Sequence, residues 1–176
     1  MATIFSHALV GCAVVSFFPK KFRTRTIYSA AGISAMLPDL DYLGFINRIP
    51  YDSLWGHRGL THSILFAACI GLLAFLIARR SFGLRLAYGF LFFLTTMTHA
   101  AVDACTNGGL GVAFYSPYNL ARYFFPWRPI QVSPMGMGVF SERGLVVFIS
   151  EFFWIVIPCC ILFLMLKALR SLKPLS

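Results

Sequence analysis

Charge is scarce in this sequence, and acidic charge is the scarcest kind. Of 176 residues only 12% are charged, with six Asp or Glu against 15 Lys or Arg. Hydrophobic residues make up 59% of the chain, and a mean hydropathy of +0.77 lies outside the range of soluble domains. The net charge of +9 therefore does not indicate a nucleic-acid-binding protein, because basic residues in a membrane protein usually record its topology.

The sequence also lacks a cysteine framework. No CxxC pair occurs, and four of the five cysteines (Cys12, Cys69, Cys159 and Cys160) lie in apolar runs, where cysteine behaves as a small hydrophobe. The N-terminal apolar run lacks the preceding positive charge and the cleavage motif of a signal peptide. We therefore expect no disulfides, no cysteine metal site, and a first helix that is retained.

Apolar segments of helical length make up most of the chain. They are residues 2–18, 26–37, 60–78, 86–105 and 144–166. They predict one all-α domain over 1–176, a polytopic integral membrane helix bundle of about five membrane segments. The second segment is too short to cross a bilayer unaided, since a crossing takes about 20 residues.

The basic residues predict how this bundle is oriented. Placing the connections after residues 18, 78 and 166 in the cytoplasm gives that side ten of the 15 basic residues and no acidic residue. The N-terminus is then outside and the C-terminus cytoplasmic. We therefore expect a multi-pass protein of the bacterial inner membrane.

Seven residues of metal-ligand type fall at one depth in this topology, near the non-cytoplasmic interface. They are His7, Asp39, Asp41, His57, His62, His99 and Asp103. Ionisable groups in membrane segments are costly and are functional candidates by default. Imidazole nitrogens and carboxylate oxygens suit a borderline metal such as zinc. The convergence predicts a membrane-embedded metal site, with zinc the expected metal.

Spacing constrains how these residues meet. His99 and Asp103 are four apart and share a helix face, and Asp39 and Asp41 face the same way if their segment is extended. His57 and His62 would point about 140° apart on one helix. They can share a metal only if His57 lies in the loop and His62 in the first helical turn.

Gly59 lets the chain bend between these two histidines, and Thr61 is a plausible helix N-cap. Simpler interpretations stay open. One histidine of the pair could merely pack against Trp55, and His99 with Asp103 could be a buried polar pair bridging helices. Glu151, in the last segment, could support the site or make a helix–helix contact.

The motifs PDLD (38–41) and HRGLTHS (57–63), with a histidine near the N-terminus and a histidine and aspartate at i, i+4, resemble the YdjM-like family of membrane-bound metal-dependent hydrolases. The resemblance runs from about His7 to Asp103. It implies a membrane-embedded hydrolase whose activity depends on a metal.

The same order of ligands is similar to the zinc-dependent phospholipase C and P1 nuclease superfamily. That similarity implies one metal held by Asp39 or Asp41, His57 or His62, His99 and Asp103. It implies a second metal held in part by His7, with Asp103 bridging the two. The N-terminal tryptophan and the later histidine and aspartate ligands of that superfamily are absent here, so one or two divalent ions are expected instead of a full three-metal cluster.

The expected function is hydrolysis of a phosphoester in a lipid or lipid-linked substrate on the non-cytoplasmic side, with Asp39, Asp41 and Asp103 as catalytic residues. Arg58 is expected to bind an anionic headgroup, since guanidinium pairs well with phosphate, although an interfacial anchor is an equal alternative. The aromatic and basic stretch 114–128 suits an interfacial lid. Rival functions are ester or amide lipid hydrolysis and non-enzymatic transport of metal or protons; the oligomeric state is left open.

Overall fold

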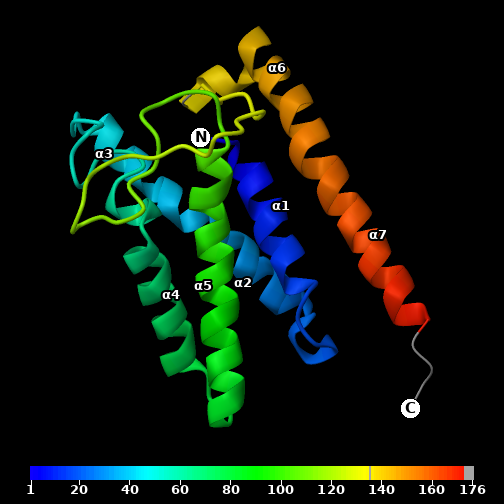
Figure 1. The fold of residues 1–176 in the computed structure, drawn as a ribbon. Helices are drawn as coiled ribbons and strands as arrows, with labels where there is room; N and C mark the ends of the chain where they lie inside the picture. The colour runs from blue at the N-terminus through cyan, green and yellow to red at the C-terminus, as the bar shows by residue number, and fades with distance from the viewer. Residues whose placement is uncertain (135, 173–176) are drawn as a thin grey trace.

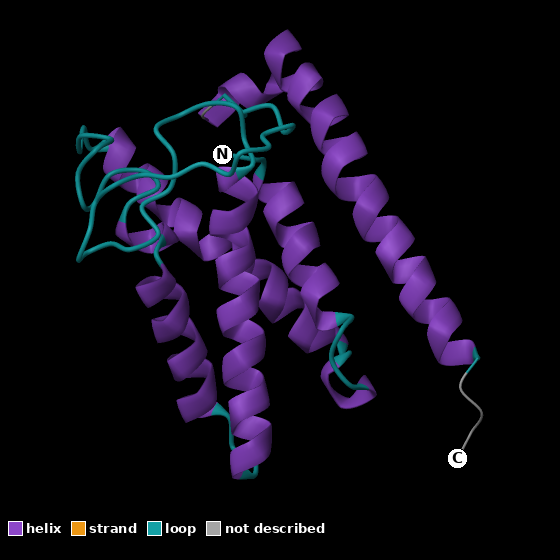
Figure 2. Ribbon diagram, in the orientation of Figure 1, coloured by secondary structure: helices purple, strands orange, loops and turns teal. Residues whose placement is uncertain are grey.

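The computed structural model describes residues 1–134 and 136–172, and within them the fold is all-α, with two isolated β-bridges and no strand (Figures 1 and 2). The α-helices are α1 (Ile4–Val15), α2 (Arg25–Met36), α3 (Tyr42–Ile46), α4 (Ile64–Ile77), α5 (Phe82–Ala104), α6 (Glu142–Glu151) and α7 (Ile157–Ser171). Short 3₁₀ helices lie at η1 (Lys20–Phe22), η2 (Leu37–Asp41), η3 (Leu60–His62) and η4 (Gly136–Phe140). A π-helical turn, η5 (Phe152–Val156), joins α6 to α7.

Three of the helices have a Ser or Thr at the N-cap position whose side chain caps the first turn. Thr3, Thr24 and Ser63 accept hydrogen bonds from backbone N–H groups in the first turns of α1, α2 and α4. The expectation that Thr61 caps α4 is wrong. Thr61 lies in the 3₁₀ turn before that helix, where its hydroxyl donates to Asp41 instead.

Helix α5 is the centre of the bundle, with α1, α2 and α4 packed around it (Figure 1). Small residues allow close contact between these helices. A Cβ on Gly11 of α1, for example, would lie 2.5 Å from the Ala35 Cβ on α2. Val15, Phe22 and Leu91 form a buried cluster toward the far end of α1.

The last helix leans away from the bundle along α1 (Figure 1). The continuous helical stretch Glu142–Ser171 has 30 residues, which extends the predicted segment 144–166 at both ends. Pro158 supplies no N–H to the helix, and the chain widens into the π turn just before it.

Among the described residues, Glu142–Ser171 is the one helix long and apolar enough to cross a membrane, and Ile4–Val15 and Ile64–Ile77 are shorter apolar helices. The all-helical prediction is confirmed. Five crossings and their orientation stay predictions.

The connection from α5 to α6 passes over the end of the bundle that holds the N-terminus (Figures 1 and 2). It is fastened by backbone hydrogen bonds. Ala113 N donates to the Arg58 carbonyl and Phe125 N donates to the Ala104 carbonyl. This connection covers the region where the predicted ligands lie.

Candidate metal centre

Five separate elements bring the seven predicted ligands to one end of the bundle. His7 comes from α1, the two aspartates 39 and 41 from η2, His57 from the loop before η3, His62 from η3, and His99 with Asp103 from the last turns of α5. All seven are buried. The structure therefore brings together the whole predicted set, while the role of each residue stays a prediction.

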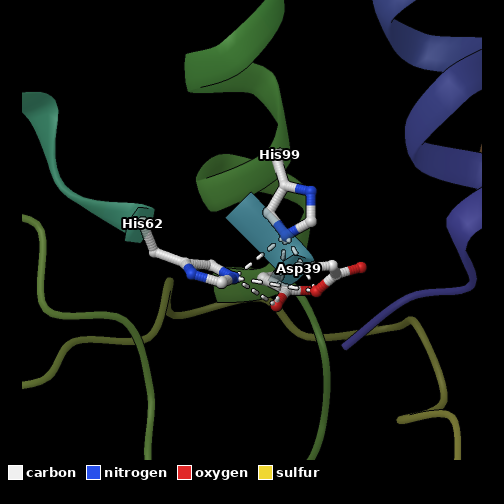
Figure 3. A group of neighbouring side chains, drawn as sticks. Asp39, His62 and His99 are labelled. Atoms are coloured by element: carbon white, nitrogen blue, oxygen red, sulfur yellow. Dashed lines mark hydrogen bonds and ion pairs between the residues drawn. The ribbon is translucent and has the colours of Figure 1, made fainter. Parts of the chain in front are cut away.

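Four of the seven form a compact group. Asp39, His62, His99 and Asp103 each offer a ligand atom, and these atoms all lie within 4.8 Å of one another. Asp39 and the two histidines point toward one another in Figure 3. The His99 Nε2 atom is 2.9 Å from His62 Nε2 and 3.4 Å from Asp39 Oδ1, and His62 Nε2 is 3.5 Å from Asp103 Oδ2. Ligand atoms about 2.1 Å from a tetrahedral zinc lie about 3.4 Å apart, so the spacing fits such an ion.

The tautomers of His62 and His99 bring two ring nitrogens together in a way that a positive charge between them would stabilise. His99 Nδ1 lies 2.7 Å from the Ala35 carbonyl, which can only accept, so Nδ1 carries the proton. His62 Nδ1 faces the Asp41 carboxylate at 3.0 Å and carries its proton for the same reason. Both Nε2 lone pairs then face each other at 2.9 Å. Two acceptors at that distance repel unless a proton or a metal ion lies between them.

Unpartnered polar atoms in the cluster indicate the same need. Both carboxylate oxygens of Asp39, both ring nitrogens of His7 and Nε2 of His57 are buried without a hydrogen-bond partner. A buried carboxylate without a partner is costly. A cation coordinated by Asp39 would remove that cost, so the residues present fit a bound metal.

Asp41 differs from Asp39 because its oxygens are already occupied. They receive hydrogen bonds from the Thr61 hydroxyl and the Arg58 backbone N–H, and they face Nδ1 of both His57 and His62. Asp41, His57 and His62 do form a second group of ligand type. Asp41 nevertheless has the position of a carboxylate that orients a metal-binding histidine through its other nitrogen.

The expectation that Asp39 and Asp41 face the same way is wrong. Their segment is 3₁₀ helix with Pro38 in its first turn, not an extended strand. With about three residues per turn, positions i and i+2 point about 120° apart. Asp39 therefore lies within the four-residue group, whereas Asp41 faces Nδ1 of His62, on the opposite side of the ring from the Nε2 atom that faces His99.

The electrostatics of the η2 and η3 residues follow from this arrangement. Burial alone would raise the pKa of the Asp41 carboxyl, yet His62 and His57 lower that pKa below its usual range. Burial lowers the pKa of His62, but the carboxylates of Asp41 and Asp103 outweigh it and raise that pKa to about 9. Without a metal, the site thus draws a proton onto His62.

His7 and Asp103 extend the cluster toward α1. The His7 ring stacks on His99 with centroids 3.7 Å apart, and His7 Nε2 is 3.4 Å from Asp103 Oδ1. The other oxygen of Asp103 faces His62. Asp103 therefore lies between His7 and His62, the position that a bridging ligand would need.

Arg58 is fully buried rather than directed toward solvent. Its guanidinium donates to Asp103 Oδ2 at 2.9 Å, to the Thr106 hydroxyl at 2.9 Å and to the Gly108 carbonyl at 3.0 Å. Its φ of 63° is rare for a residue with a side chain. This geometry favours a role in orienting Asp103, and headgroup binding stays a prediction.

Sequence reasoning missed several supporting residues. Tyr51, not Trp55, packs edge-on against His57, with ring centroids 5.4 Å apart. Arg122 holds the loop from outside by donating to the carbonyls of His57 and Tyr51. The contact of Thr61 with the site could have been expected, because this residue lies within the HRGLTHS motif. Nothing in the sequence pointed to Tyr51 or Arg122, since only the fold brings these two residues to the site.

A cavity of about 290 Å³ opens beside Asp41. Apolar side chains dominate its walls, among them Leu40, Leu54, Trp55 and Leu60. The large side chains of Leu40 and Trp55 are also exposed. Among the described residues, Asp41 is therefore the one acidic residue in the wall of a mainly apolar cavity.

Over the described residues, the fold is an apolar helical bundle with one helix long enough to cross a membrane and a buried histidine–aspartate cluster that could hold a metal ion. The chain matches the YdjM inner membrane protein family over residues 1–172 and belongs to that family. It is also 36% identical over 168 residues to the inner membrane protein YbcI of Escherichia coli (strain K12), covering 94% of this chain and 97% of that protein. No solved structure matches it.

The family match supports a bacterial inner membrane location and reaches beyond the 7–103 stretch that carries the sequence motifs. The family description states a location and no reaction.

Proposed function

We propose that this protein is a metal-dependent hydrolase of the inner membrane, with zinc held by Asp39, His62, His99 and Asp103. The observation that carries the proposal is the close approach of the Nε2 atoms of His62 and His99, 2.9 Å apart, beside the unpartnered Asp39 carboxylate. When bound, zinc supplies Lewis acidity and lowers the pKa of a coordinated water to about 7.

The chain's own residues have distinct tasks in this proposal. Asp41 holds the proton on His62 Nδ1 and so keeps Nε2 free to bind. Arg58 fixes the orientation of Asp103. His7, stacked on His99 beside Asp103, is positioned to help hold a second ion.

A lipid or lipid-linked phosphate is the proposed substrate. The apolar cavity beside Asp41 and the exposed Leu40 and Trp55 suit a substrate that arrives from the bilayer. The preference for a phosphoester rests on the similarity of the ligand order to phosphoester-cleaving zinc enzymes. Ester or amide cleavage is the rival within hydrolases.

Transport of metal or protons is a weaker alternative. A pathway across the membrane needs ionisable groups along its length. In this sequence residues 8–38, 63–98 and 152–176 contain no His, Asp or Glu. The candidate ligands are confined to one end of the bundle.

Metal content tests the first part of the proposal. Protein purified in detergent should hold at least one equivalent of zinc or a similar metal, measured by elemental analysis. Asp39→Asn and His99→Ala should lose it, and Asp41→Asn should weaken zinc affinity about 10- to 100-fold, as loss of an orienting partner does. Asp52→Asn, in the exposed loop, is the matched control. A folded wild-type protein without metal would refute the proposal.

Lipid extracts incubated with the wild type and with Asp39→Asn, then compared by mass spectrometry, test the reaction. A phosphorylated product formed only by the wild type supports phosphoester cleavage. Release of fatty acid without such a product would leave the metal hydrolase and reject the phosphoester. No product from any lipid, with metal bound, would reject the lipid hydrolase.

A further inference from the structure

The end of the bundle away from the metal cluster carries uncompensated positive charge. Its basic residues lie in the α1–α2 connection and at the end of α7, and we call them the basic rim: Lys20, Lys21, Arg23, Arg25, Lys167 and Arg170. All six acidic residues of the chain lie elsewhere. Among the described residues one ion pair joins a Lys or Arg to a carboxylate. It is the pair of Arg58 with Asp103, which lies outside the rim. Arg23 Nε is buried without a hydrogen-bond partner.

Next to this rim an apolar slot separates the last helix from the bundle. The slot has a volume of about 330 Å³, at the lower end of the range for ligand pockets. Its walls include Leu9, Ala13 and Tyr28 on one side and Cys159, Leu162 and Phe163 on the other. Figure 1 shows α7 diverging from α1 and α2 in this region.

Polar contacts join the last helix to the α1 region on both sides of the slot. Near the candidate metal site, Glu151 accepts hydrogen bonds from Thr3, the N-cap residue of α1, and from Ser6 within that helix. Near the basic rim, the Arg170 guanidinium donates to the carbonyl of Ser16, which itself lines the slot. Between these two contacts no residue of α7 is buried. The helix is held at its ends while its middle leaves room for an apolar chain.

We propose that the slot binds one acyl chain of an anionic phospholipid, whose phosphate is held by the basic rim. The apolar walls suit a hydrocarbon chain, and Lys and Arg without carboxylate partners suit a phosphate. Basic pockets between membrane helices bind anionic headgroups in this way. The site is separate from the metal centre and independent of the proposed hydrolysis.

Lipid retention measures this directly. Protein purified in mild detergent is incubated with an equimolar mixture of phosphatidylglycerol and phosphatidylcholine, and bound lipid is counted by native mass spectrometry. The wild type should retain one phosphatidylglycerol in preference to phosphatidylcholine. Lys20→Gln/Lys21→Gln and, separately, Lys167→Gln should reduce that preference, the double variant roughly 30-fold. Ala13→Phe, which fills the slot, should reduce retention of both lipids.

Arg79→Gln/Arg80→Gln is the matched control, since these residues lie in the α4–α5 connection and do not line the slot. The control should keep the preference, and every variant should keep a cooperative thermal unfolding transition, which shows that it is folded. Equal retention of the two lipids, or an equal loss in the control, would overturn the proposal. Displacement of the lipid by millimolar inorganic phosphate would instead identify a free-anion site and reject the lipid.

Discussion

Arg58 illustrates how burial changes the task of a residue. A guanidinium that binds substrate needs free donors, whereas this one is committed to Asp103, Thr106 and Gly108. The ion pair with Asp103 is entirely out of solvent. A buried pair of this kind contributes little net stability while intact, but loss of one partner leaves a charge that is costly to bury.

We therefore predict that Arg58→Ala destabilises the protein by about 3–5 kcal/mol. The thermal unfolding midpoint in detergent, followed by circular dichroism, measures this. Arg48→Ala, which removes another residue of positive φ from an exposed loop position, is the control and should change little. If Arg58→Ala kept its midpoint and lost only substrate affinity, the headgroup role predicted from the sequence would be right and the orienting role wrong.

The identities of the clustered residues could be predicted from sequence because His and Asp are so rare in an apolar chain. Their geometry could not. Asp39 and Asp41 look equivalent in PDLD, and only the 3₁₀ winding of η2 separates a carboxylate with free oxygens from one that is fully hydrogen-bonded. Winding of a five-residue segment depends on what packs around it, which local sequence does not encode.

At the scale of elements, the turn between His57 and His62 depends on close backbone contact at Gly59. A Cβ added there would lie 2.4 Å from the Leu54 carbonyl oxygen and 2.7 Å from the Gly56 carbonyl oxygen. Backbone atoms cannot move aside as the end of a flexible side chain can. The turn must therefore open to accept any side chain.

Gly59→Ala should consequently displace His57 and His62 and lower metal content, although no ligand is changed. Elemental analysis and the unfolding midpoint measure the two effects. Gly83→Ala is a close control, because Gly83 lies in the first turn of α5 and a Cβ there meets nothing within 4 Å. It should be neutral or stabilising by up to about 1 kcal/mol, the helix-propensity gain of Ala over Gly. Full metal content in Gly59→Ala would show that the turn is not needed for the site.

Glu151 also acts between elements, because its carboxylate contacts Thr3 and Ser6 near the start of α1 and none of the candidate metal ligands. Its carboxylate accepts hydrogen bonds from the Thr3 backbone and from the hydroxyls of Thr3 and Ser6. Of the two roles left open by the sequence, the helix–helix contact is the one the geometry favours.

We predict that Glu151→Gln loosens the last helix while leaving bound metal unchanged. An amide offers one acceptor oxygen in place of two and turns an NH₂ group toward hydroxyl donors. Hydrogen exchange of the α6 backbone should therefore rise. Glu142→Gln, at the first residue of α6, should not raise it. Loss of metal in Glu151→Gln without faster exchange would assign the carboxylate to the site instead.

For the whole molecule, the sequence predicted the all-helical class and the approximate positions of the helices, because apolar segments and breakers are local features. It did not predict how long the helices are relative to the thickness of the bilayer core. Helix α1 has 12 residues and α4 has 14, which correspond to about 18 and 21 Å. A bilayer core is about 30 Å thick. If their basic ends lie at one membrane surface, the metal cluster beyond their other ends approaches the opposite surface from within.

Which surface that is follows from the segregation of charge. Ten of 15 basic residues lie on one side of the predicted topology, with no acidic residue, and such a side is normally cytoplasmic. We therefore predict that Tyr118→Cys, in the exposed connection over the metal cluster, reacts with a membrane-impermeant maleimide in intact cells. Ser171→Cys, at the end of α7, should react only after permeabilisation. The wild type, whose own cysteines are half-buried or lie on the apolar helices, gives the background. The reverse pattern would place the candidate metal centre on the cytoplasmic side, and the proposed lipid substrate would then come from the inner leaflet.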